Sequence, residues 1–420
     1  MPSDRGNGLA MRTGLLLDAY VKRFDVDLVV IPVAGGTEIL TPFVAERVRR
    51  ATVLRPAKPD THFTLINSLA DADARLAAFR QYARPSIAAR LGPEVERALL
   101  AFAEHHPYSM VHVSRLYLAS LAAAWTAPGS DQRPYVVLDC DEDDVSAYRR
   151  FAQLHRRWGR DRRADWADAE AEAFGTLARV WLPRFDLLLA ASSSEARILS
   201  TRGQGVAVTV LPNVAASARS RRKSLREGRH DVLFVGNMNY LPNIDAALWF
   251  ATRIWPKLRS MVPFPIRFVI AGNGPPPEVV ALARRPGIVV LGGFDDVAPL
   301  YRRAALAVVP IRAGGGTRIK LFESANHGVP VVATRFGASG TGFRSGHELL
   351  LAENEREFAA SCAKVLTRGN LASQLATRAL TRVRGDYNAK RLATRLLSTI
   401  NAMELGDGRN TDQSRGPRRQ

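Results

Sequence analysis

The sequence predicts an α/β fold made of two Rossmann-like domains with parallel sheets that face each other across a cleft. Short apolar runs alternate with helical patterns over residues 1–213, and the alternation starts again after a basic, polar segment at 214–230. This alternation is typical of parallel strands covered by helices on both faces. In the second half, glycines follow the apolar runs, where parallel sheets commonly bind ligands.

Length and composition fit a two-domain globular protein. The chain has 420 residues, of which 46% are hydrophobic and 24% charged. Cys140 and Cys362 lie far apart and form neither a disulfide pattern nor a metal motif, so we expect a reducing, cytoplasmic location. The first eight residues do not resemble a secretory signal, and no apolar run reaches the roughly 18 residues of a spanning helix.

The elements follow from the apolar pattern. The first half is expected to hold strands at 26–33, 52–54, 110–113, 135–139, 187–191 and 206–211, and helices at 9–22, 71–90, 94–105, 116–125 and 141–179, the last divided into more than one helix. The second half is expected to hold strands at 232–235, 267–271, 288–291, 306–310, 329–333 and 349–352, and helices at 245–259, 278–285, 297–304, 318–327, 355–365, 371–387 and 390–403.

These elements predict a first Rossmann-like domain at 1–213, a linker at 214–230, a second Rossmann-like domain at 231–389, a crossing helix at 390–405 and a disordered tail at 406–420. The crossing helix has apolar Leu392, Leu396, Leu397 and Ile400, which need a surface to cover, and we expect that surface on the first domain.

One stretch, 314–334, has the features of an anion site. Gly314, Gly315 and Gly316 remove side chains where the backbone turns, and Thr317 can cap the following helix. Free N–H groups and the helix dipole point at the same place, and Arg318 and Lys320 add positive charge. Glu323 is an acceptor for sugar hydroxyls. The set suits a nucleotide diphosphate with an attached sugar; the alternative is a capped helix with a surface ion pair of Lys320 and Glu323.

Four motifs follow one another in the second half: FVGNMNYLPNIDAALWF at 234–250, VIAGNGPPP at 269–277, GGGTRIKLFESANHGVPVVAT at 314–334 and HELLLAENEREFA at 347–359. With them the second half resembles the retaining glycosyltransferases of family 4, which have the GT-B fold of two Rossmann domains. The first half is similar through MVHVSRLYLA at 110–119 and LDCDEDDVSAYRR at 138–150. It looks like the branch found in bacterial polysaccharide-assembly clusters.

The resemblance implies a function: transfer of a hexosyl unit, with retention, from a nucleotide sugar to a hydroxyl of a polysaccharide or lipid-linked acceptor. It implies that the domain at 231–389 binds the nucleotide-sugar donor and that the domain at 1–213 lies on the acceptor side. It implies that Glu323 holds the ribose and that Gly316 and Thr317 meet the diphosphate, with Arg318 and Lys320 as catalytic cations. The rest of the expected donor site is Gly236, Asn237, Gly272, Gly274 and Gly315. No metal or cofactor is expected. The alternatives are a non-catalytic nucleotide-binding partner in a polysaccharide-assembly complex and a nucleotide-sugar epimerase.

The sequence departs from the family pattern at three parts of the site. The family pattern has two paired glutamates, and the first of them would fall at Gly315. Many members also have an arginine and a lysine for the diphosphate after the first strand of the second domain, where this sequence has Asn237, Met238 and Asn243. The active-site histidine would fall near Ser114; His112 is two residues earlier and, by strand alternation, on the same face. His112 either points into the cleft as a catalytic residue or is a satisfied core histidine.

The N-terminus is a fourth departure. Family members open with a strand and a glycine-rich loop, and here residues 5–8 look like the remnant of that loop. In a doubly wound sheet the first strand is central. We therefore expect the strands that contain Val29 and Val111 to be separated by a gap or joined irregularly.

The net charge is +19, and basic residues cluster in two places. These clusters are Arg156, Arg157, Arg160, Arg162 and Arg163, and Arg219, Arg221, Arg222, Lys223, Arg226 and Arg229. They indicate either a peripheral contact with anionic membrane at the inner face, aided by Trp158 and Trp166, or a solvated helix face and a basic linker. Nucleic acid is not an expected partner, because few aromatic residues interleave with the clusters.

Overall fold

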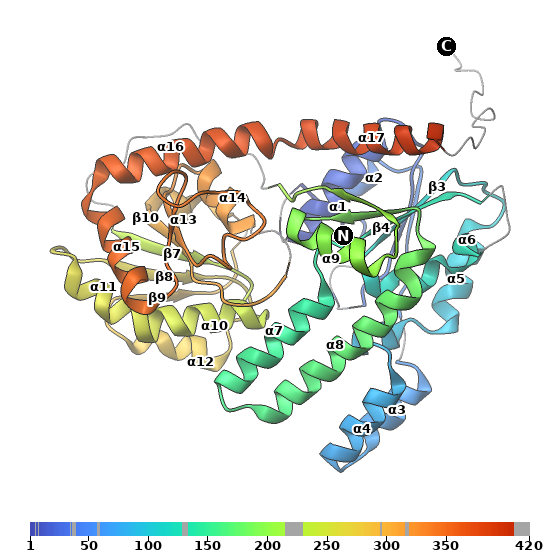
Figure 1. Cartoon of the computed structure of the whole chain (residues 1–420), viewed down its shortest axis with the longest axis horizontal. Coiled ribbons are helices and arrows are strands. Elements are labelled where there is room, and N and C mark those ends of the chain that lie inside the picture. The colour runs from blue at the N-terminus through green and yellow to red at the C-terminus, as the bar shows by residue number, and fades with distance from the viewer. Residues whose placement is uncertain are drawn as a thin grey trace.

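The computed structural model describes residues 1–4, 6, 8–33, 35, 39–56, 59–127, 133–214, 230–294, 296–315 and 319–406, of which 403–406 by their backbone only. It contains two Rossmann-like regions side by side, and two long helices at the end of the chain run from one region to the other (Figure 1). We call them the N-terminal region, up to residue 214, and the C-terminal region, from residue 230. Most of the expected linker (215–229) and tail (407–420) lies outside the described residues.

The strands of the N-terminal region form two separate sheets. β1 (Asp27–Val30) pairs in parallel with β2 (Arg50–Val53), and β3, β4, β5 and β6 form a parallel four-stranded sheet in chain order. The bounds are β3 (Met110–Ser114), β4 (Tyr135–Asp139), β5 (Leu187–Ala190) and β6 (Ala207–Val210). Val29 and Val111 thus belong to different sheets, which is the gap that we expected. β4 and β5 are buried throughout, whereas β1 is only partly buried.

Helices cover these sheets, and three of them, at 42–45, 61–68 and 193–202, were not expected. The bounds are α1 (Gly8–Tyr20), α2 (Pro42–Ala45), α3 (Thr61–Ser68), α4 (Ala72–Tyr82), α5 (Pro93–Ala103), α6 (Ala123–Thr126), α7 (Asp144–Arg157), α8 (Asp161–Trp181) and α9 (Ser193–Arg202). Short 3₁₀ helices span Ser86–Arg90, Leu116–Ala122 and Leu182–Arg184. α3 and α9 begin at Asp60 and Ser192, whose side chains accept N-cap hydrogen bonds. The helix expected at 116–125 is mostly 3₁₀.

Two expected helices end where the backbone turns left-handed. The segment 141–179 divides into α7 and α8, as expected, with Gly159 at a φ of +64° between them. The helix expected at 71–90 stops as α4 because Ala83 adopts a φ of 52°, and a 3₁₀ turn follows Pro85. The signal in the sequence for this early end was Pro85, because a proline disfavours helical backbone at the residue before it.

The C-terminal region has one parallel sheet with the order β12-β11-β10-β7-β8-β9. The strands are β7 (Asp231–Val235), β8 (Arg267–Ala271), β9 (Ile288–Leu291), β10 (Ala304–Val309), β11 (Val331–Ala333) and β12 (Leu350–Leu351). The helices are α10 (Leu241–Trp249), a π turn (Phe250–Ile254), α11 (Trp255–Met261), α12 (Pro277–Val280), a 3₁₀ turn (Ala281–Arg284), α13 (Ala298–Arg303), α14 (Ile319–Asn326), α15 (Glu355–Thr367), α16 (Gly369–Asp386) and α17 (Ala389–Gly406). The order confirms the α/β fold class with parallel sheets.

The last helix returns to the N-terminal region. Leu392, Leu396 and Ile400 of α17 belong to the same buried apolar cluster as Leu15 and Leu16 of α1, together with residues of β4 and β5. This is the packing that the apolar face of residues 390–403 predicts. Among the described helices, none is both long enough and apolar enough to cross a membrane.

Candidate functional site

Three loops meet at the carboxyl edge of the C-terminal sheet, after β7, β8 and β10. The N–H of Gly236 donates to the carbonyl of Ala271 at 2.9 Å. A Cβ at Gly272 would clash with the carbonyl of Gly236, and one at Gly274 (φ +64°) would clash with Asn239. The predicted residues Gly236, Gly272 and Gly274 are therefore brought together, and close packing of loop against loop is what requires glycine there.

The two asparagines after β7 hold this turn. Nδ2 of the buried Asn243 donates to the carbonyl of Asn237 at 2.7 Å, and Oδ1 of Asn237 accepts from the N–H of Asn239 at 3.0 Å. Lys320 of α14 lies beside them, because a Cβ at Gly236 would come within 3.0 Å of the Lys320 Cε. Lys320 thus brings its positive charge to the loop where the resemblance implies a cation.

Glu323 lies one turn further along α14 and is partly buried. Burial raises the pKa of its carboxyl group, and Lys320 and a hydrogen bond from Tyr301 oppose that rise. The Tyr301 hydroxyl donates to Oε2 at 3.4 Å, and the Tyr301 ring stacks on His327 with centroids 4.7 Å apart. A carboxylate with little water around it and a loop of backbone groups in front suits a hydroxyl-bearing ligand. Gly316, Thr317 and Arg318, which complete the predicted site, lie outside the described residues.

The N-terminal region contacts the loop between β10 and α14. Nη1 of Arg150, in α7, donates to the carbonyl of Gly314 at 3.0 Å. The neighbouring Phe151 packs edge-on against Tyr240, with ring centroids 5.7 Å apart. The hydroxyl of Tyr240 in turn accepts from the N–H of Gly315 at 3.4 Å. The loop that was predicted to bind the diphosphate is therefore lined by both regions.

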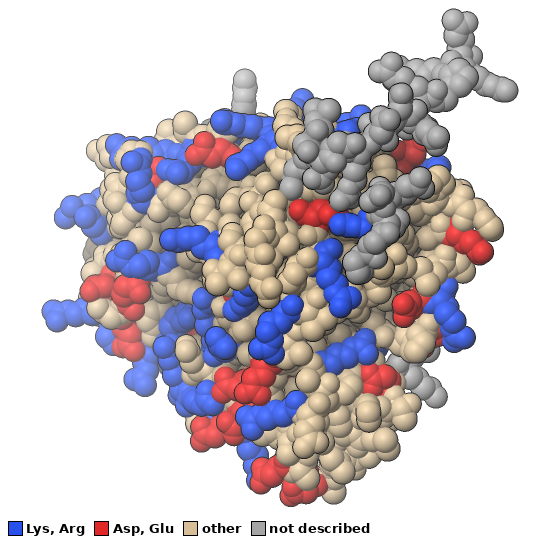
Figure 2. Space-filling view, turned by 45° about the vertical axis from the view of Figure 1, so that its right-hand side comes forward, with Lys and Arg blue, Asp and Glu red and all other residues tan. Residues whose placement is uncertain are grey.

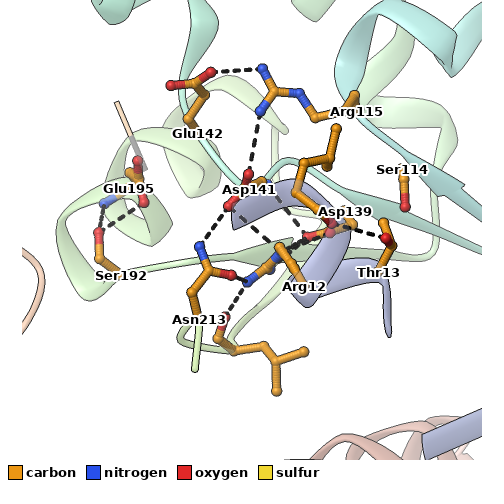
Figure 3. A network of polar contacts seen from close by, with 12 residues as sticks. Arg12, Thr13, Ser114, Arg115, Asp139, Asp141, Glu142, Ser192, Glu195 and Asn213 are labelled. Carbon is orange, nitrogen blue, oxygen red and sulfur yellow. Dashed lines mark hydrogen bonds and ion pairs between the residues drawn. The ribbon is translucent and has the colours of Figure 1, made fainter. Parts of the chain in front are cut away.

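An acidic turn after β4 reaches the same loop. Oε2 of Glu142 lies 2.5 Å from where a Cβ at Gly315 would be, so only glycine leaves room for this carboxylate. Arg115, which follows β3, holds the turn by donating to Glu142 at 2.7 Å and to Asp141 at 3.4 Å (Figure 3). It also donates to Asp144 at 2.9 Å. Burial raises the pKa of Asp144 to about 7, with a further contribution from nearby carboxylates against the opposing charge of Arg115.

Two residues at this contact, one after β3 and one after β4, have unusual backbone conformations. Arg115 has a φ of 85° and Asp141 a φ of 30°, values that non-glycine residues rarely adopt. Such strain persists only where the surrounding contacts enforce it, and it is concentrated at functional sites.

The buried Arg12 is hydrogen-bonded to residues that hold the acidic turn, and its role was not predicted from the sequence. Its Nε and Nη2 donate to the carboxylate of Asp139 at 2.7 and 2.6 Å, and Nη1 donates to the carbonyl of Leu211 and to Asn213 (Figure 3). Nδ2 of Asn213 donates to Asp141 at 2.9 Å. The available signal was an arginine among the apolar residues of the first turns of α1, since a buried charge is kept only if it is paired.

His112 makes hydrogen bonds with both ring nitrogens. Nδ1 lies 2.9 Å from the Tyr20 hydroxyl and Nε2 lies 3.2 Å from Oγ of Ser114, which places His112 and Ser114 on one face as strand alternation predicts. Burial lowers the pKa of His112 to about 4, so the ring is neutral at pH 7. These contacts match the satisfied-histidine alternative, and a catalytic role for His112 remains a proposal.

The first basic cluster is partly neutralised. Arg156 pairs with Asp168 at 2.5 Å, and the guanidinium of Arg160 lies 4.6 Å from the ring centroid of Trp158. Trp166, expected as a membrane anchor, instead stacks on Phe79 at 4.5 Å between α4 and α8. Figure 2 shows Asp and Glu side chains among the Lys and Arg side chains of the face that it draws. The second cluster lies outside the described residues.

The part of the chain that carries the glycine loops matches a known family. Residues 229–368 match the model of the family Glycosyl transferases group 1. An uncharacterized 44.6 kDa protein in the cps region of Klebsiella pneumoniae is 23% identical over 172 residues, which are 39% of this chain and 44% of that protein. The alignment thus spans less than half the length of this curated relative.

Solved structures share the whole architecture. The sucrose-phosphate synthase of Thermosynechococcus elongatus has a TM-score of 0.64 at 12% identity, with 96% of this chain and 94% of that chain covered. Anabaena HepE in complex with UDP and glucose has a TM-score of 0.61 at 13% identity, with 96% and 98% covered. A Rickettsia africae glycosyltransferase has a TM-score of 0.58 at 12% identity, with 96% and 97% covered. The fold is that of the GT-B glycosyltransferases, and together with the family match it supports a glycosyl-transfer role.

Arg12 offers a test of what holds the acidic turn. Arg12→Met should lower the free energy of unfolding by about 3–5 kcal/mol, because Asp139 is left buried without its partner. The double variant Arg12→Met/Asp139→Leu should recover a large part of the loss, since no charge is left buried unpaired. Urea unfolding followed by circular dichroism measures both. A single variant as stable as the wild type would show that the pair does not anchor α1.

Proposed function

We propose that the chain is a retaining glycosyltransferase of family 4 that transfers a hexosyl unit from a nucleotide sugar to a hydroxyl of a polysaccharide or lipid-linked acceptor. The observation that carries the proposal is the meeting of Glu323, Lys320 and the glycine loops at one sheet edge, lined on its other side by the N-terminal region. Two comparisons support it: HepE was solved with UDP-glucose, and the Klebsiella protein is encoded in a cps region.

The proposed roles follow the geometry. Residues 231–389 bind the donor and residues 1–213 the acceptor, joined by a linker at 214–230 and by the crossing helix at 390–405. Glu323 accepts from ribose hydroxyls, while backbone groups of Gly315, Gly316 and Thr317 meet the diphosphate. Gly236, Asn237, Gly272 and Gly274 shape the adjoining wall. His112, through Ser114, belongs to the acceptor side.

The proposed reaction retains the configuration by front-face attack. The bond between the anomeric carbon and the diphosphate oxygen breaks, the acceptor oxygen bonds to the same face, and its proton passes to the departing diphosphate. Arg318, Lys320 and the loop amides stabilise the negative charge that develops on this leaving group. Positioning of the two substrates supplies the remainder of the rate acceleration. Neither a metal nor a cofactor is given a role.

A binding and turnover experiment on one sample tests the function. UDP, GDP, ADP and their common hexose conjugates are screened for a rise in melting temperature, which specific binding produces by mass action. The conjugates that bind are then incubated with lipid-linked or oligosaccharide acceptors. We expect one base to be preferred and its sugar to be transferred with retention. Binding without any turnover would favour the non-catalytic partner, and an altered free donor sugar would favour the epimerase.

Glu323→Ala should weaken binding of the preferred nucleotide sugar by about 1.5–3 kcal/mol, because a charged acceptor for ribose hydroxyls is lost. Glu104→Ala, at an exposed position of the N-terminal region, serves as the control. Isothermal calorimetry on folded variants measures the effect. Unchanged affinity would remove Glu323 from the binding site.

We also propose that the enzyme is cytoplasmic and contacts anionic membrane peripherally. The exposed Arg157, Arg162 and Arg163 are the described residues for this contact, and Trp166 is not part of it. Flotation with vesicles of phosphatidylglycerol should occur at low salt and decrease at high salt, since exposed charges are screened. Flotation that is absent, or insensitive to salt, would contradict an electrostatic contact.

A further inference from the structure

Arg150 is the arginine through which the N-terminal region reaches the glycine loop of the C-terminal region. It projects from α7, and its Nη1 donates to the carbonyl of Gly314 at 3.0 Å. Its guanidinium lies 5.0 Å from the ring centroid of Phe336, which follows β11. Gly314 itself has a φ of +111°, so the turn that presents this carbonyl depends on glycine. The side chain is therefore held at the loop by two contacts with the C-terminal region.

Nearby arginines are paired with carboxylates, whereas Arg150 has no such pair among the described residues. Arg115 pairs with Glu142 and Asp144, Arg156 with Asp168, and Arg202 with Asp143. Within the described ranges Arg150 meets a neutral carbonyl and an aromatic ring, and no carboxylate within 4 Å. The planar guanidinium carries five N–H donors in a fork that fits phosphate oxygens. One donor is used by Gly314, which leaves donors for an anion at the loop.

The carboxylate of Glu142 also reaches this loop, but it is already paired with another arginine. The carboxylate of Glu142 lies beside Gly315, but its Oε1 accepts from Arg115 at 2.7 Å, and Arg115 is itself fixed at the end of β3 by an N–H donated to the carbonyl of Asp139 at 2.8 Å. Arg115 therefore compensates Glu142 and holds it in its own turn. Arg150 and Lys320 are then cations that approach the loop from the two opposite regions.

We propose that Arg150 binds the donor diphosphate at the phosphate that carries the sugar, and so couples donor binding to the contact between the two regions. This rests on the proposed function. The acceptor belongs to the N-terminal region, so the breaking bond must lie between the regions, and the sugar-bearing phosphate is the part of the donor nearest to α7. As the anomeric carbon–oxygen bond breaks, that phosphate gains negative charge, which the guanidinium stabilises.

Nucleotides of different length separate this role from a purely structural one. Calorimetry is performed with UDP, GDP and ADP and with the matching monophosphates, on wild type, Arg150→Ala, Arg150→Lys and the control Arg149→Ala. Arg149 is the preceding residue, is exposed and carries the same charge. Melting temperatures establish that each variant is folded.

We expect Arg150→Ala to weaken binding of the preferred diphosphate about tenfold or more and binding of its monophosphate less than about threefold. Arg150→Lys should recover part of the loss, because the charge returns without the fork, and Arg149→Ala should match the wild type. Equal losses for diphosphate and monophosphate, or no loss, would overturn the role of Arg150 while leaving the proposed function in place. A wild-type protein that binds none of the diphosphates would instead overturn the proposed function, and this inference with it.

Discussion

The buried ion pair of Arg12 and Asp139 is the interaction on which the N-terminal side of the site depends. Two charges withdrawn from water are tolerated only when their hydrogen bonds are satisfied, and Arg12 achieves this with Asp139, the carbonyl of Leu211 and the side chain of Asn213. The pair joins α1 to the carboxyl ends of β4 and β6. α1 also packs against α17, and its first residue, Gly8, lies against Ile319 of α14. One helix thus contacts the four-stranded sheet, the last helix and α14.

From this pair a continuous series of polar contacts leads to the glycine loop. Asn213 donates to Asp141, and Arg115 donates to both Asp141 and Glu142 (Figure 3). The carboxylate of Glu142 in turn lies beside Gly315. The strained backbone of Arg115 and Asp141, which costs on the order of 1–3 kcal/mol per residue, is enforced by these bonds. Because each group in the series is fixed by the next, the carboxylate at the loop has a defined position rather than a range of rotamers. This is the kind of support that a preorganised site requires.

The sequence was sufficient to predict the fold class and the glycine loops that meet at the edge of the C-terminal sheet, for a physical reason. Strands β4, β8 and β9 have the bounds that their apolar runs predict, because each is a short run closed by polar or glycine residues. The glycine loops were found because their chemistry is local. The contacts of Arg12, Glu142 and Arg150 are not local: their partners lie at Asp139, Gly315 and Gly314, and only the tertiary structure brings them together. Trp166 was misjudged for the same reason, since its partner Phe79 comes from another helix hairpin.

The division of the N-terminal strands into two sheets does not disturb this arrangement. The outer pair, β1 and β2, is attached through Asp27, whose pKa is held well below its usual range by hydrogen bonds from Arg49, Arg50 and Tyr108. Asp139 is the last residue of β4, and Asp141 and Glu142 follow it. This strand lies inside the four-stranded sheet and is buried along its whole length. The groups that face the glycine loop are therefore carried by the continuous sheet, and the gap lies on the other side of β3.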